Sequence, residues 1–189
     1  MKYSFDRSQI SENFGLKPAQ ERIGHIVLMV LLLLVVVAPF SALWGVESLW
    51  QETKANFVWV IVAFFASFYV HEGLHALGFM LFGGVPREAI SIRAEWKNLD
   101  VQTFCGAPVS ASAFRKAALL PALVLGIIPA IVSIVYGIGW LAFWSVLALN
   151  AVTYDLLCVW VIRSLDADDM VVLTADPSIP DSVRNGTSG

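Results

Sequence analysis

The chain has 189 residues, of which 58% are hydrophobic and 14% are charged, and its formal net charge at pH 7 is −3. Soluble globular domains average roughly 45–50% apolar and about 25% charged residues, so this composition excludes an ordinary soluble domain. Nucleic-acid motifs, phosphate loops and CxxC pairs are absent from the sequence, and Cys105 and Cys158 alone do not make a disulfide framework. We therefore expect a membrane protein that does not bind nucleic acid and whose two cysteines are ordinary thiols.

Four apolar runs are long enough to cross a bilayer, whose hydrocarbon core takes about 20 helical residues. They cover residues 23–44, 57–83, 117–136 and 138–163. We predict an all-α membrane protein with four transmembrane helices and a short β-hairpin between the second and third. The expected parts are an N-terminal segment (1–22), a membrane domain (23–163) and an acidic tail (164–189). The first run is too long for the core of a cleavable signal peptide, so we expect it to remain as a span.

Lysine and arginine are concentrated before the first run, between the second and third, and after the fourth. The other two connections hold Lys54 as their single basic residue. Because loops rich in lysine and arginine stay on the cytoplasmic side, both termini and the loop 84–116 are predicted to be cytoplasmic. His25 lies at the start of the first run, where we expect a structural, interfacial role.

The second run contains the pentapeptide His71-Glu72-Gly73-Leu74-His75, which has the form HExxH. Residues i and i+4 share one face of a helix, so both imidazoles can reach a single metal ion, and Glu72 can serve as general base toward a metal-bound water. Ionisable groups inside an apolar span are costly, and this indicates a functional site. The alternative is a chance match to a short pattern.

The loop after the second run carries an alternating pattern. Residues 90–96 alternate apolar and polar side chains, residues 97–100 resemble a turn, and residues 101–105 resemble a returning strand. This pattern predicts the β-hairpin, beside the cytoplasmic end of the HExxH site. Its edge either holds an extended substrate peptide by backbone pairing or only covers the helices, and the sequence leaves both readings open.

Small residues recur every four positions in the third run, which allows close helix packing. They are Ala118, Ala122, Gly126 and Ala130. Pro121 and Pro129 in the same run are expected to kink this helix or to begin it.

The fourth run contains Asp155, which, with Glu72, is one of the two acidic residues deep within the apolar runs. Counted from the outer ends of their spans, His71 and His75 lie 14 and 18 residues in, and Asp155 lies 16 residues in. Because both spans run in the same direction, the three side chains come to the same level, which favours Asp155 as the third metal ligand. The alternatives are an interhelical hydrogen bond for Asp155, or Glu95 or Asp100 from the loop as the third ligand.

Asn150 lies one and a half turns before Asp155 in the same run. Its amide is a candidate donor to the developing oxyanion or an orienting group for a ligand. A contact that only holds two helices together is an equal alternative. Thr153 and Tyr154 flank Asp155 and are weaker candidates for a supporting role.

The segments HEGLHALGFMLFGG and Asn150–Asp155, with the hairpin-like loop and the proline-containing third run, resemble the putative zincin peptidases. These are small four-helix membrane proteins similar to the site-2 protease family of intramembrane metalloproteases. The resemblance covers residues 20–180 and implies His71, His75 and Asp155 as zinc ligands and Glu72 as catalytic base. Two features depart from site-2 proteases, since Leu156 follows Asp155 where they usually have glycine, and a PDZ-like regulatory domain is absent from the sequence.

The sequence thus predicts a peptidase that holds one Zn²⁺ per chain and hydrolyses a peptide bond within or near the membrane. Its partners would be a peptide or transmembrane-protein substrate and the lipid bilayer. Two other classes remain open. A zinc-binding sensor or assembly factor would bind metal without needing Glu72, and a scaffold or permease-like protein would need neither zinc nor His75.

Overall fold

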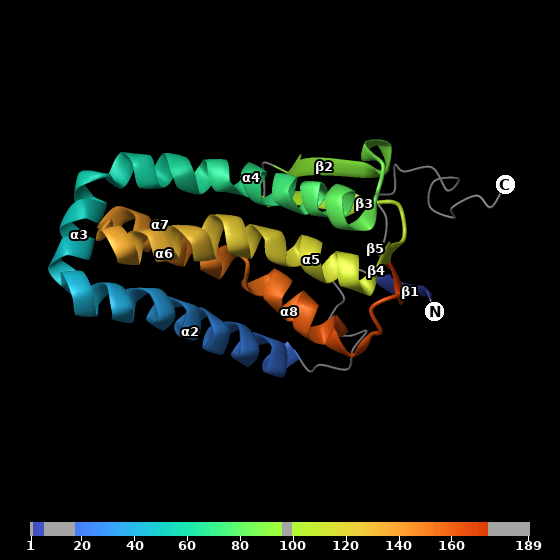
Figure 1. Cartoon of the computed structure of the whole chain (residues 1–189), viewed down its shortest axis with the longest axis horizontal. Helices are drawn as coiled ribbons and strands as arrows, with labels where there is room; N and C mark the ends of the chain where they lie inside the picture. The colour runs from blue at the N-terminus through green and yellow to red at the C-terminus, as the bar shows by residue number, and fades with distance from the viewer. Residues whose placement is uncertain (1, 6–17, 96–99, 174–189) are drawn as a thin grey trace. The chain divides into compact units, whose positions relative to one another are not determined.

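The computed structural model describes residues 2–5, 18–95 and 100–173, and it is mostly helical, as predicted (Figure 1). The chain divides into two compact units. Residues 19–71 and 121–154 form a helical unit, and residues 1–18, 72–120 and 155–189 form a unit that contains the strands, which we call the sheet unit. Helix α4 begins in the first unit and ends in the second.

The helical unit is built from long apolar segments. It comprises α2 (Pro18–Trp44), α3 (Val46–Ala55), the first half of α4 (Phe57–Gly83), a π-helical segment (Ala122–Ile127), α6 (Ile128–Tyr136) and α7 (Gly139–Ala151). Many of its large apolar side chains are exposed, among them Val35 and Trp59 at 66% and 68%. Side chains of this kind on the outside of a helix suit a lipid environment better than water.

Helix α3, which was not predicted, joins α2 to α4 at one end of this unit (Figure 1). Its Glu52 carboxylate accepts a hydrogen bond of 2.6 Å from the backbone N–H of Gly139, the first residue of α7. A Cβ at Gly139 would come within 2.8 Å of the Leu49 Cα, so glycine permits this close approach. A carboxylate at the positive end of a helix dipole is stabilising, and it holds α3 against α7.

Three helices are long and apolar enough to span a membrane, and they cover residues 22–44, 57–83 and 111–136. The fourth predicted span is a bent pair, because α7 and α8 (Thr153–Val161) meet at 41°. A single continuous helix over residues 138–163 is therefore wrong. Val152 leaves helical geometry with ψ near 2°, and the Thr153 hydroxyl donates to the Asn150 carbonyl at 2.8 Å, a local bond that competes with the helical pattern.

The third span also departs from a regular helix. Helix α5 (Ala111–Pro121) passes into the π-helical segment directly after Pro121. Within the helical unit, a Cβ added to Gly126 would lie 2.4 Å from the Leu149 Cδ2, so the predicted small-residue packing is confirmed at this position.

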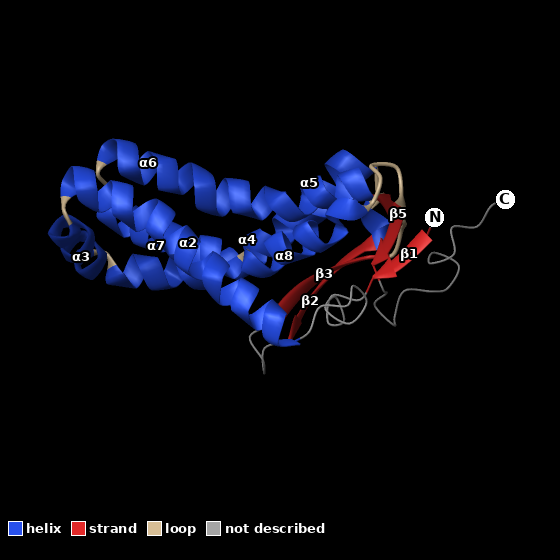
Figure 2. Ribbon diagram, turned by 90° about the horizontal axis from the view of Figure 1, so that it is seen from below, coloured by secondary structure: helices blue, strands red, loops and turns tan. Residues whose placement is uncertain are grey.

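The sheet unit contains the predicted hairpin, formed by β2 (Ile90–Glu95) and β3 (Asp100–Cys105) in antiparallel register (Figure 2). Ile92 pairs with Thr103, which leaves residues 96–99 to connect the strands, outside the described residues. A second sheet was not predicted and has the order β1–β5–β4, from β1 (Lys2–Phe5), β5 (Met170–Leu173) and β4 (Val109–Ser110). Most of the N-terminal segment and of the tail after residue 173 lies outside the described residues.

Candidate metal and catalytic site

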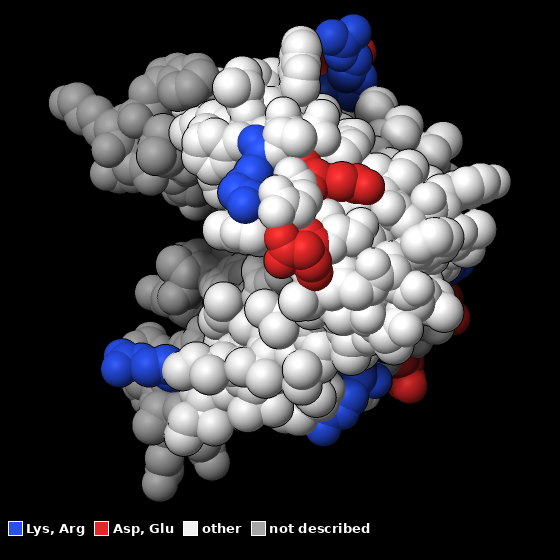
Figure 3. All heavy atoms as spheres, turned by 90° about the vertical axis from the view of Figure 1, so that its left-hand side faces the viewer, with Lys and Arg blue, Asp and Glu red and all other residues white. Residues whose placement is uncertain are grey.

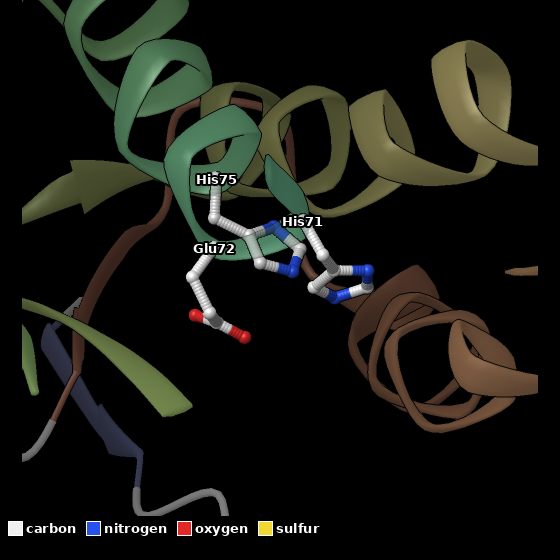
Figure 4. A group of neighbouring side chains, drawn as sticks. All are labelled: His71, Glu72 and His75. Atoms are coloured by element: carbon white, nitrogen blue, oxygen red, sulfur yellow. The ribbon is translucent and has the colours of Figure 1, made fainter. Parts of the chain in front are cut away.

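The HExxH residues lie on one continuous stretch of α4, where helical geometry determines their arrangement. His71, Glu72 and His75 each offer one ligand atom, and these atoms all lie within 4.8 Å of one another. Their side chains project from the same side of the helix (Figure 4). Glu72 is 6% exposed and His75 is fully buried, so the cluster that the i, i+4 spacing predicted is largely shielded from solvent.

The ring of His75 is oriented by the backbone of α5. Its Nδ1 lies 3.1 Å from the carbonyl oxygen of Ala117. A carbonyl only accepts hydrogen bonds, so Nδ1 carries a proton, and Nε2 is the ring nitrogen left to bind a metal ion. Metal-binding histidines are held in this way, with the second ring nitrogen donating to a carbonyl or carboxylate.

Close packing of α4 on α5 in the sheet unit makes this contact possible. A Cβ at Gly78 would lie 2.6 Å from the Ala117 Cα, nearer than any side chain could approach. The next residue of α4, Phe79, packs against Phe114 with ring centroids 6.2 Å apart, and both rings are buried. Glycine at position 78 and the aromatic pair together bring the Ala117 carbonyl to His75.

Asp155, in the first turn of α8, lies beside His75. Its Oδ1 is 3.4 Å from His75 Nε2, and the Asp155 residue is 4% exposed. Nε2 and the Asp155 carboxylate oxygen, which can both donate an electron pair, thus lie face to face in a buried position. Such a pair requires a proton or a cation between its atoms.

The separation fits a metal ion. Zinc–nitrogen and zinc–oxygen bonds of about 2.0–2.2 Å at the tetrahedral angle put two ligand atoms about 3.4 Å apart. The observed distance between Nε2 and Oδ1 is the same. Two imidazoles and a carboxylate are a donor set typical of catalytic zinc, so the residues present are suited to this ion.

Strand β3 contacts the same turn of α4, through a residue that the sequence reading missed. The Thr103 hydroxyl donates a hydrogen bond of 2.8 Å to the carbonyl oxygen of Glu72, and Thr103 is 4% exposed. The only sequence signal was its place on the same strand face as Val101 and Cys105. The hairpin is thereby attached to the HExxH turn within the sheet unit.

The structure gives Asn150 and His25 surroundings within the helical unit. The Asn150 side-chain nitrogen donates to the Val146 carbonyl at 2.7 Å, and its Oδ1 is buried without a hydrogen bond among the described residues. Both ring nitrogens of His25 lie near the Thr153 hydroxyl, at 3.2 and 3.3 Å. The catalytic role predicted for Asn150 and the structural role predicted for His25 both stay predictions.

The rival third ligands in the loop, Glu95 and Asp100, pair across the hairpin as backbone residues. Their side chains lie outside the part of the chain that the structure describes. The two cysteines are thiols in the described structure, and both are buried.

Comparison with known proteins gives one family. The family model described as "Putative zincin peptidase" matches residues 64–169, a stretch that includes the HExxH turn, the hairpin and Asp155. Searches of the curated proteins and of the solved structures found no match.

Proposed function

We propose that this chain, which belongs to the putative zincin peptidase family, is a zinc-dependent peptidase that hydrolyses a peptide bond within or close to a lipid bilayer. The observation that carries the proposal is the pair His75 Nε2 and Asp155 Oδ1, 3.4 Å apart and buried, on a helix that also holds His71 and Glu72. A membrane setting is supported by the three apolar helices and the bent pair.

In the proposed site, His71, His75 and Asp155 hold the metal ion and Glu72 does the proton chemistry. When bound, zinc polarises a carbonyl and lowers the pKa of its water toward about 7. Glu72 lies in the same turn as the first histidine, where its carboxylate can accept a proton from the attacking water.

In the proposed reaction Glu72 is the single proton carrier. The water oxygen forms a bond to the peptide carbonyl carbon, and one of its protons goes to the Glu72 carboxylate. The carbon–nitrogen bond then breaks, and Glu72 returns this proton to the leaving amine nitrogen. The low exposure of Glu72 and His75 keeps bulk water from competing for these protons.

The substrate is proposed to be a membrane-embedded or membrane-adjacent polypeptide. A transmembrane helix hydrogen-bonds its own carbonyls internally, so the scissile segment has to unwind before a carbonyl can reach the site. Hairpin β2–β3 is attached to the HExxH turn through Thr103, which supports the proposal that its edge binds the extended segment by backbone pairing.

The test compares bound metal with proteolysis in the detergent-purified chain and in cells. We expect about one zinc per chain in the wild type, with its loss in His75→Ala and Asp155→Ala. Glu72→Gln should keep the metal, because Glu72 is not a ligand in this scheme, and should abolish the new protein N-termini that the wild type generates in host membranes.

The outcomes separate the alternatives. Zinc bound with proteolysis unchanged in Glu72→Gln would mean that Glu72 is not the base and would contradict the mechanism. Zinc bound without any Glu72-dependent cleavage would favour a sensor or assembly factor. Absence of zinc from the wild type, even after zinc is resupplied, would overturn the metal site and leave a scaffold.

A further inference from the structure

The carbonyl that orients His75 is unusual within its own helix. In a regular α-helix the carbonyl of residue i accepts from the N–H of residue i+4, and for Ala117 that residue is Pro121. Proline has no N–H, so the Ala117 carbonyl lacks the donor that its own helix would supply. This oxygen lies 3.1 Å from His75 Nδ1.

We propose that Pro121 is a positioning residue for the metal site. By withholding its N–H, it leaves the Ala117 carbonyl to His75 and so keeps the proton on Nδ1 and the Nε2 lone pair directed at the metal position. The inference rests on the proposed function in that the metal is taken to be zinc, but the effect on His75 is a property of the metal-free chain.

Because the contact is buried, the orientation of His75 depends strongly on the Ala117 carbonyl oxygen. His75 and Ala117 are both fully buried, so water does not replace the carbonyl as a partner for Nδ1. The approach of the two helices at Gly78 leaves no space for a side chain between them. A buried polar group without its partner is costly, so loss of this acceptor would favour another tautomer or another ring orientation.

A purely mechanical role for Pro121 makes a different prediction. Proline inside a helix is unfavourable, so its replacement by alanine should stabilise α5 and the π-helical segment that follows. The alanine N–H at position 121 would also compete for the Ala117 oxygen and draw it into the regular helical ladder. The gain in helix stability would raise the thermal unfolding midpoint, whereas the competition for the Ala117 oxygen would lower the zinc affinity. Measuring both quantities therefore separates the two effects.

The experiment uses the full chain in detergent and compares Pro121→Ala with Pro129→Ala, a matched control further along the same span. Zinc affinity is measured by competition with a chelator, and the thermal unfolding midpoint is measured without metal. We expect Pro121→Ala to weaken zinc binding about 10–100-fold, the range typical of lost supporting contacts, while its metal-free midpoint stays the same or rises. Pro129→Ala should change the affinity less than about twofold, since it leaves this contact intact.

A second measurement does not depend on zinc. Nitrogen-15 NMR of histidine-labelled, metal-free protein should show one histidine fixed with its proton on Nδ1, and Pro121→Ala should reduce that population. An unchanged tautomer together with unchanged zinc affinity would overturn the inference. A joint fall of affinity and thermal midpoint would also overturn it, because that is the result of general destabilisation. If the wild type binds no zinc, the proposed function fails while the NMR comparison still decides the role of Pro121.

Discussion

The Thr103 hydroxyl on strand β3 donates a 2.8 Å hydrogen bond to the carbonyl oxygen of Glu72, in the middle of the HExxH turn. The contact joins residues 31 positions apart in the sequence and is buried. The hairpin and the turn that carries the proposed base therefore hold each other in position.

Thr103→Val should loosen this attachment. Valine has nearly the shape of threonine and lacks the hydroxyl, so the change removes one buried hydrogen bond, worth about 1 kcal/mol of unfolding free energy. Hydrogen exchange of the β3 amides should become faster in Thr103→Val and stay near wild type in Thr103→Ser. Unchanged exchange in the valine variant would mean that the hydroxyl does not hold the hairpin.

Gly78→Ala should destabilise the sheet unit, because the added Cβ would lie 2.6 Å from the Ala117 Cα. Overpacking of this kind costs about 1–3 kcal/mol, and separation of α4 from α5 would also lengthen the bond between His75 and the Ala117 carbonyl. Gly73→Ala is the matched control on the same helix, since a Cβ there meets nothing within 4 Å. We expect it to stabilise the helix by roughly 0.5–1 kcal/mol. Unfolding in denaturant measures both, and equal effects would contradict the packing argument.

Glu52→Ala should destabilise the junction of α3 with α7. The carboxylate accepts from the Gly139 N–H, and the loss of a charged acceptor at a helix N-terminus costs about 1–2 kcal/mol. Glu47→Ala removes an exposed carboxylate in the first turn of α3 that accepts from Gln51, and we expect it to cost less, about 0.5 kcal/mol. Figure 3 views the side of the helical unit on which α3 lies, where acidic and basic side chains lie among uncharged ones. A comparable loss in both variants would argue against the specific contact.

Cys105 should react slowly with alkylating reagents. Burial raises the pKa of its thiol above the ordinary value, so less thiolate is present at any given pH than in an exposed cysteine. At pH 8 we expect modification by iodoacetamide to be at least about tenfold slower than for a small thiol, and to accelerate on unfolding. Peptide mass spectrometry separates Cys105 from Cys158, and fast modification of Cys105 in the folded chain would contradict its burial.

The features that follow a local pattern could be predicted from the sequence. Apolar length gave the first two spans near their observed limits, and alternation gave the strands that begin at Ile90 and end at Cys105. The i, i+4 spacing gave the cluster of His71 and His75, and equal depth in two spans brought Asp155 to His75. Each of these features depends on the period of a helix or strand, or on the rise per residue of a helix. Residues close together in the sequence determine both quantities.

The features that depend on a distant partner could not be predicted. Strand β5 has only four residues, and its partners β1 and β4 come from distant parts of the chain. The break at Val152 accompanies a hydrogen bond from the Thr153 hydroxyl to the Asn150 carbonyl, and the sequence does not show which carbonyl that hydroxyl will bind. Pro121 was visible as a breaker of helical bonding, but the acceptor of His75 was not, because no rule of spacing connects position 75 to position 117.

The pairing of β5 has a consequence for the order in which the protein is made. Both β1 and β4 pair with this strand, which emerges from the ribosome after them, and the sheet unit that it joins also contains Glu72, His75 and Asp155. The helical unit is complete when Tyr154 has been synthesised, whereas the sheet unit still lacks Asp155 and β5. A nascent chain therefore acquires the helices of the helical unit before it acquires every residue of the proposed site, and the sheet unit has all of its described strands only after translation has passed residue 173.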